Sequence, residues 1–158
     1  MYCFLIKIRS SLLVFLTHHM ALPFLKIIRK PAVFPYTLDA LSNMQNGTLG
    51  YDLYLFLNKN NLNLLPYYAK HDVKHILLGY NTTEDGEVCL QCFMLGNKHI
   101  SFPVIATVLF GFLTMPEYYK KFIAAYKLGA HANSLKNWDW LGILEDHTKN
   151  LQQKIYAK

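Results

Sequence analysis

Apolar residues recur along most of the chain at the three- and four-residue spacing of a helix. Leu49, Leu53, Phe56 and Leu57 are one example, and the strict alternation that marks a half-buried strand is not found. Helices with one apolar face must bury that face against other helices. The pattern therefore predicts an all-α, single-domain multi-helix bundle of about eight helices with an apolar groove.

Turn and capping residues divide this pattern into segments. Thr48 has the side chain of an N-cap, whereas Gly79 and Gly129 are typical of helix ends. Three prolines suit the first turns of helices. We expect helices at residues 35–44, 49–58, 66–78, 87–96, 102–115, 116–128 and from Asn137 or Asp139 through Ile155.

No segment is predicted to cross a membrane. Sixteen uncharged residues follow Arg9, but two histidines and a proline interrupt them, and a span needs roughly 20 mostly apolar residues. A second uncharged stretch, from His99 to Pro116, contains Pro103 and Gly111. We therefore expect this second stretch to form a buried helix.

Charge separates the beginning of the chain from the rest. The 158 residues carry a formal net charge of +6, and five basic residues precede Asp39 without an acidic one. Nucleic-acid-binding domains usually gather lysine and arginine on the folded body, so the nearly neutral remainder argues against a nucleic-acid partner. A basic, apolar arm is typical of contact with an anionic membrane surface, although a helix packed on the body would fit equally well. Residues 1–38 are thus assigned to a basic apolar N-terminal arm or helix.

The densest chemical signal is the run that contains His71, Asp72 and His75, with Glu87 twelve residues after the second histidine. On a helix, the first three side chains fall within an arc of about 100°. Histidines at i and i+4 can bind one transition metal ion together. Asp72 could bind the same ion or orient one of the histidines, and Glu87 would add a further donor. Two imidazoles and two carboxylates suit Zn²⁺ or Fe²⁺ better than Mg²⁺ or Ca²⁺. Residues 39–158 are accordingly interpreted as a helical metal-binding domain.

The same residues fit two other interpretations. Because Lys74 lies inside the motif, the histidines could belong to an ordinary solvated helix face. His71-Asp72 could also be the core of a histidine-aspartate phosphohydrolase. That site needs an upstream histidine, and the candidates His18 and His19 lie about fifty residues earlier, which disfavours it.

The cysteines offer a further candidate site. Cys89 and Cys92 form a Cys-x-x-Cys pair, which could bind zinc or react as a redox pair. Measured around a helix from Glu87, however, they lie at about 200° and 140°, on the opposite face. We therefore expect them to fill the core. Three cysteines in all favour a reducing compartment over a disulfide framework.

Several of these motifs resemble the coenzyme Q (ubiquinone) biosynthesis protein four family. Its signature is similar to His71-Asp72-x-x-His75 followed by eleven residues and Glu87. Further similar stretches occur in the family's order, namely Gly47-Thr48-Leu49-Gly50, Gly86-Glu87 and Ala124-Ala125-Tyr126-Lys127-Leu128-Gly129. Two stretches depart from the family, which has Arg-Tyr-Arg-Glu and Lys-Trp-Phe-Glu in place of Tyr67-Tyr68-Ala69-Lys70 and Leu90-Gln91-Cys92-Phe93.

The resemblance implies a divalent metal, usually zinc, held by His71, Asp72, His75 and Glu87. It implies removal of the ring C1 carboxyl from a polyprenylated hydroxybenzoate, a step in ubiquinone assembly. We expect the metal to act as a Lewis acid, while one of the catalytic carboxylates, Glu87 or Asp72, moves a proton. Glu87 is the better candidate, because a loop delivers it from outside the helix that bears the histidines. The alternative function is a non-catalytic prenyl-lipid-binding scaffold that organises a quinone biosynthetic complex.

The resemblance also implies partners and a location. The expected partners are a prenylated quinone precursor or related lipid, an anionic membrane surface, other quinone biosynthesis proteins and a second copy of the chain. The prenyl tail would lie along residues 102–115 or 12–24. The expected location is the cytoplasm, peripheral to the inner membrane, or the matrix side of the mitochondrial inner membrane.

Overall fold

The structure is a computed structural model of the chain, and it describes residues 34–65 and 68–157. These residues form seven α-helices and one short 3-10 helix, and no strand occurs among them, which confirms the predicted all-α class. Most of the predicted N-terminal arm lies outside the described residues. The helices are α3 (Leu38–Ser42), α4 (Leu49–Lys59), α5 (Ala69–Leu78), α6 (Glu84–Gly96), α7 (Phe102–Thr114), η2 (Pro116–Tyr118), α8 (Tyr119–His131) and α9 (Thr148–Tyr156).

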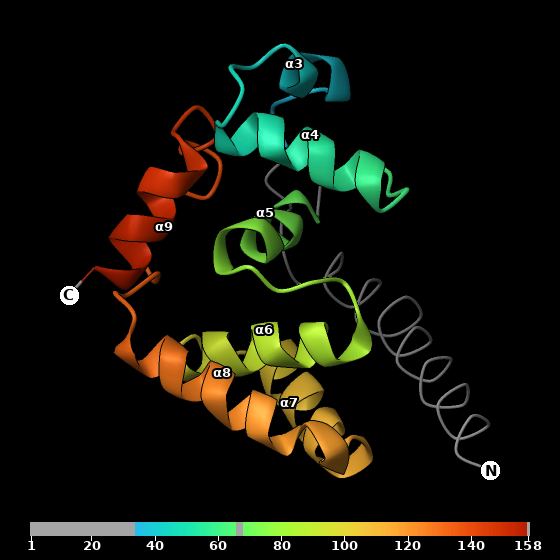
Figure 1. Ribbon diagram of the computed structural model, residues 1–158, viewed down its shortest axis with the longest axis vertical. Coiled ribbons are helices and arrows are strands. Elements are labelled where there is room, and N and C mark those ends of the chain that lie inside the picture. Colours follow the sequence, from blue (N-terminus) through green and yellow to red (C-terminus); the bar gives the residue numbers. More distant parts are fainter. Residues whose placement is uncertain (1–33, 66–67, 158) are drawn as a thin grey trace.

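Helix α5 lies between two groups of helices. Figure 1 shows α3 and α4 at one end of the molecule and α6, α7 and α8 at the other, with α9 along one side. Within these groups α3 packs against α4, and α6 packs against both α7 and α8. Helix α5 contacts α4, α6 and α9, so it joins the two ends of the domain.

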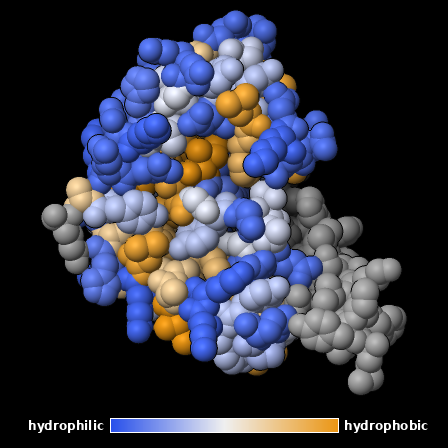
Figure 2. All heavy atoms as spheres, viewed as in Figure 1, coloured by the Kyte–Doolittle hydropathy of each residue, from blue (hydrophilic) through white to orange (hydrophobic). Residues whose placement is uncertain are grey.

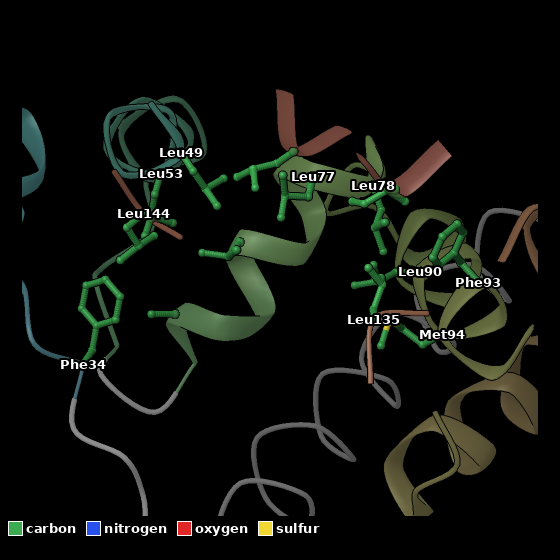
Figure 3. Packing of buried hydrophobic residues seen from close by; sticks show 14 of the residues in the cluster. Phe34, Leu49, Leu53, Leu77, Leu78, Leu90, Phe93, Met94, Leu135 and Leu144 are labelled. Atoms are coloured by element: carbon green, nitrogen blue, oxygen red, sulfur yellow. The ribbon is translucent and has the colours of Figure 1, made fainter. Parts of the chain in front are cut away.

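Two clusters of buried side chains hold these helices together. The main core surrounds α5 and extends from Phe34 and Leu49 at one end to Phe93 and Met94 at the other (Figure 3). The second cluster lies on the opposite side of α6 and consists of Val88, Cys89, Cys92, Met115, Phe122 and Ala125. The two cysteines are free and buried there, which confirms that they fill the core. Helix α6 therefore contributes side chains to both clusters.

Helix α6 begins three residues earlier than the sequence predicted. Thr83 is its N-cap and accepts a hydrogen bond from the backbone N–H of Gly86 at 3.3 Å. Three acidic residues follow in the first turn, where the helix dipole favours negative charge. Glu87, which the sequence placed at the first position of this helix, belongs to its first turn.

Two further helix boundaries differ from prediction. Gly129 lies inside α8, where a Cβ atom would collide with the backbone of Phe93, so it permits close packing of α8 on α6. The last helix begins only at Thr148. The preceding residues form turns whose carbonyl oxygens, at Leu144 and Asp146, accept hydrogen bonds from the first backbone N–H groups of α4. By contrast, Thr48 and Gly79 cap α4 and α5 as predicted.

Helix α7 was expected to be buried, and this expectation is wrong. Its only buried residues are Val104 and Gly111, the second of which packs against Val88 of α6. All of its exposed residues are apolar and lie within an arc of about 100° around the helix axis. We call this surface the α7 stripe, and it comprises Phe102, Ile105, Ala106, Leu109 and Leu113. Leu113 is 81% exposed and Phe102 75%.

The α7 stripe is one of several places where large hydrophobic side chains are exposed. Figure 2 shows one face of the molecule, mostly polar, with hydrophobic side chains gathered towards its middle. Among the residues that the structure describes, no helix is both long enough and apolar enough to cross a membrane. The predicted apolar groove stays a prediction, since the segment proposed to line it presents an exposed stripe instead.

Candidate metal centre

The candidate site lies where α5 faces the first turn of α6. His71 and His75 are one helical turn apart on α5, and Glu87 approaches them from α6. The chain reverses between the two helices at Gly79, whose φ of 72° is the left-handed conformation that glycine adopts most readily. The Thr83 cap then starts α6 at the position that turns Glu87 towards α5.

Glu87 contacts both histidines with different oxygen atoms. Its Oε2 lies 3.2 Å from Nε2 of His71, and its Oε1 lies 3.0 Å from Nε2 of His75. One ligand atom from each of the three residues can be chosen so that all lie within 4.8 Å of one another. The three side chains could therefore hold a metal ion, as the sequence predicted for these residues.

The ring of His75 is fixed on both sides. Its Nδ1 lies 3.0 Å from the carbonyl oxygen of Tyr80, and because a carbonyl can only accept, this nitrogen donates the hydrogen bond. Nε2 is thereby directed at Glu87, which is the orientation that metal-bound histidines commonly have when their other ring nitrogen donates to a carbonyl. Phe56 of α4 stacks on the same ring, with the ring centroids 6.0 Å apart. The His75 side chain is only 1% exposed, so it forms the inner wall of the site.

Asp72 lies beside the site without joining the group of three. Its Oδ1 is 3.8 Å from Nδ1 of His71, on the side of the ring away from Glu87. This is an ion-pair distance and too long for a hydrogen bond. Of the two roles that the sequence left open for Asp72, the geometry favours orienting His71, and its role as a direct ligand stays a prediction.

Charge in the site is balanced between His71 and the carboxylates. Burial by itself would lower the pKa of His71, but Asp72 and Glu87 outweigh it and raise that pKa to about 9. Burial would likewise raise the pKa of Glu87, yet its contacts with His71 and His75 lower it to about 2. At neutral pH the metal-free site therefore holds a protonated His71 against an ionised Glu87, and a cation that binds there must displace the proton.

Comparison with known proteins identifies a solved structure with a similar fold. No known protein family matches the sequence, and no curated protein matches it. A solved structure, however, resembles this chain in its fold. It is a protein of Nostoc punctiforme PCC 73102, provisionally named a ubiquinone biosynthesis protein, with a TM-score of 0.64 over 79% of this chain and 69% of that one. The two sequences are 22% identical, so the likeness establishes a shared fold.

Three residues at the site escaped the sequence analysis. Phe56 and the carbonyl group of Tyr80 support His75, and neither has a local signal, because both come from outside the helix that they support. Tyr68 lies against His71, with ring centroids 6.1 Å apart. This residue could have been found, since it lies three and seven residues before the two histidines, which is the spacing of one helix face.

Proposed function

We propose that the protein acts in ubiquinone biosynthesis as a metal-dependent enzyme that removes the C1 carboxyl group of a polyprenylated hydroxybenzoate. The observation that carries this proposal is the convergence of His71, His75 and Glu87 on one point between α5 and α6. Support for the pathway comes from the spaced motif and from the shared fold with the Nostoc punctiforme protein, whose name refers to ubiquinone biosynthesis.

The donor set suits a catalytic metal better than a structural one. Structural zinc sites are closed by four protein ligands, whereas catalytic zinc sites use three, often two histidines and a glutamate, and keep a position open. The same set of two histidines and one carboxylate binds Fe²⁺ in enzymes with open coordination positions. His71, His75 and Glu87 match both patterns, so we assign the site to Zn²⁺ or Fe²⁺.

The side chains around this set have separate tasks in the proposed reaction. When bound, the divalent ion would supply Lewis-acid stabilisation to a substrate oxygen. The Tyr80 carbonyl holds His75 in place, and Asp72 holds His71. Loss of carbon dioxide leaves the electron pair of the broken bond on the ring, where a proton must be added. Because both oxygens of Glu87 face histidines, Asp72 is the carboxylate left to move that proton.

The α7 stripe supports a peripheral position on an anionic lipid surface. Helix α7 has 13 residues, about 20 Å of length, which is too short to span a bilayer and sufficient to lie along one. From Lys98 to His131 there are four lysines and a single acidic residue, Glu117. An excess of lysines in the segment that carries an exposed apolar stripe fits the negative charge of lipid headgroups, although Lys121 pairs with Asp85 at 3.1 Å. A substrate with a long prenyl chain would be met at such a surface.

The alternative function is a prenyl-lipid-binding scaffold without catalysis. The α7 stripe favours it, because contact with lipid through this surface requires no metal. Removal of Glu87 distinguishes the two functions. A scaffold would keep both lipid binding and quinone production, whereas an enzyme would lose quinone production.

The test is made on full-length protein purified without a metal-affinity tag. We expect elemental analysis to find about one zinc or iron per chain, because three converging donors retain an ion. Glu87→Ala should abolish both the metal content and the ability to restore ubiquinone production in cells that lack the corresponding step. Glu145→Gln, at an exposed carboxylate away from the site, is the control and should change neither. A metal-free protein that still restores production would overturn the proposal, as would an active Glu87→Ala variant.

A further inference from the structure

Tyr68 lies on the helix face that bears the candidate ligands. It immediately precedes α5, and its carbonyl oxygen accepts hydrogen bonds from the backbone N–H groups of His71 and Asp72, at 2.7 and 3.2 Å. The chain is therefore already wound at this point. With about 100° per residue, the Tyr68 side chain falls inside the arc formed by His71, Asp72 and His75.

Three aromatic rings form a row along this face, and the row leads outwards. The rings of His75 and His71 are 4.7 Å apart between centroids, and those of His71 and Tyr68 are 6.1 Å apart. The exposed fraction rises from 1% for His75 to 30% for His71, and Tyr68 is half-buried. Phe56 and the carbonyl group of Tyr80 contact His75 at the inner end of the row, and Tyr68 stands at its outer end.

The phenol of Tyr68 can donate a hydrogen bond. Among the described residues, no side chain or carbonyl accepts a hydrogen bond from this hydroxyl. A donor is thus available beside His71, at the outer end of the row of rings.

We propose that Tyr68 binds the substrate, its hydroxyl donating a hydrogen bond to the carboxylate of a benzenoid acid held beside His71. This inference rests on the proposed function, because it takes the benzenoid acid as the ligand. A hydroxyl that donates to a carboxylate forms a charge-assisted hydrogen bond, which is stronger than a neutral one. It also distinguishes the acid from its decarboxylated product, which offers no acceptor at that position.

The experiment compares two ligands on the zinc-loaded, full-length protein. Titration calorimetry measures binding of 3-geranyl-4-hydroxybenzoate and of 2-geranylphenol, which lacks the carboxyl group. We expect Tyr68→Phe to weaken binding of the acid about tenfold and to leave binding of the phenol unchanged. The zinc affinity of the variant should equal that of the wild type, since the phenylalanine ring retains the packing against His71. Tyr126→Phe, at an exposed tyrosine on α8, is the matched control.

Each other outcome has a definite meaning. If Tyr68→Phe binds the acid as tightly as the wild type, the role of Tyr68 is overturned while the proposed function stands. An equal loss for both ligands, or a loss of zinc affinity, also overturns it, because the hydroxyl would then act on something other than the carboxylate. If the wild-type protein binds neither ligand, the result contradicts both the proposed benzenoid substrate and the proposed role of Tyr68.

Discussion

Nδ1 of His75 donates a hydrogen bond to the carbonyl oxygen of Tyr80, across 3.0 Å and five residues. The turn that leads from α5 into α6 thereby fixes the ring that faces Glu87. The same turn begins at Gly79 and ends at the Thr83 cap. One short connection thus sets both the direction of a histidine and the position of the carboxylate that meets it.

The geometry predicts different metal affinities for two carboxylate-to-amide substitutions. Glu87→Gln removes a charged donor and should lower zinc affinity strongly, whereas Asp72→Asn should lower it about tenfold, as is typical when a ligand loses its orienting partner. Competition with a chromophoric chelator measures both. Equal losses would show that Asp72 is itself a ligand, contrary to the geometry around His71.

Zinc binding should depend on pH through His71. Because the pKa of His71 is raised to about 9 in the metal-free site, binding below that pH displaces a proton, and apparent affinity should rise about tenfold per pH unit towards pH 9. Calorimetry in two buffers with different ionisation enthalpies counts the protons released. Zinc affinity that does not change from pH 7 to pH 9 would contradict this prediction.

Stability of the metal-free protein should also depend on pH. The pKa of His71 is raised from 6.5 to about 9, so its stabilising contribution is complete below pH 6.5 and disappears as the pH rises through 9. The pKa of Glu87 is lowered from 4.5 to about 2, so its contribution is complete above pH 4.5 and disappears as the pH falls through 2. Urea unfolding should therefore show both contributions in full between pH 4.5 and pH 6.5.

A control separates these two groups from the other titrating residues. In His71→Gln, the decline of the unfolding free energy between pH 6.5 and pH 9 should become shallower than in the wild type. An identical decline in both proteins would show that His71 does not cause it.

Gly129→Ala tests the close packing of α8 on α6, because packing and helix propensity predict opposite changes in the free energy of unfolding. By helix propensity alone, alanine would stabilise α8 by up to about 1 kcal/mol. The added Cβ would meet the backbone of Phe93, so we expect a loss of about 1–3 kcal/mol in the free energy of unfolding. Ala130→Gly, at the exposed neighbouring position, should cost only about 0.5–1 kcal/mol. A stabilised Gly129→Ala variant would contradict the packing.

The α7 stripe predicts binding to lipid vesicles. Replacement of Leu109 and Leu113 by glutamate should weaken binding to vesicles of phosphatidylcholine and phosphatidylglycerol at least about tenfold, since each buried leucine contributes about 1.5–3 kcal/mol. Both leucines are exposed, so thermal stability should change little. Leu55→Glu, at an exposed leucine on α4, is the control. Sedimentation with vesicles at moderate salt measures the effect, and undiminished binding would exclude the stripe as the contact surface.

The sequence predicted most of the metal site because helix geometry is local. Residues at i and i+4 share a face of any α-helix, so the relation of His71 to His75 needed no knowledge of the fold. The position of Glu87 depends on the conformation of an entire turn, so the sequence could name it as a candidate donor but could not fix its distance from the histidines. The start of α6 was placed three residues too late, because the capping role of Thr83 was not recognised.

Two other predictions were wrong because contacts between residues distant in the sequence determine the structure there. Leu141 and Leu144 have helical spacing with Leu151, yet the carbonyl oxygen of Leu144 bonds to the first turn of α4 instead of continuing a helix. Phe102 to Met115 has no polar face to mark the side that meets water, so its pattern could not distinguish a buried helix from an exposed apolar one. In both cases the deciding neighbour lies far away in the sequence.

Glu87 and Val88 are consecutive residues with opposite surroundings. Glu87 faces the histidines of α5, while Val88 is fully buried and packs against Gly111, on the inner side of α7. Because close-packed interiors transmit strain, a tilt of α7 would press on the residue adjacent to the carboxylate. Helix α7 and the candidate metal site thus meet consecutive residues of the same helix, so a displacement of α7 would act directly beside Glu87.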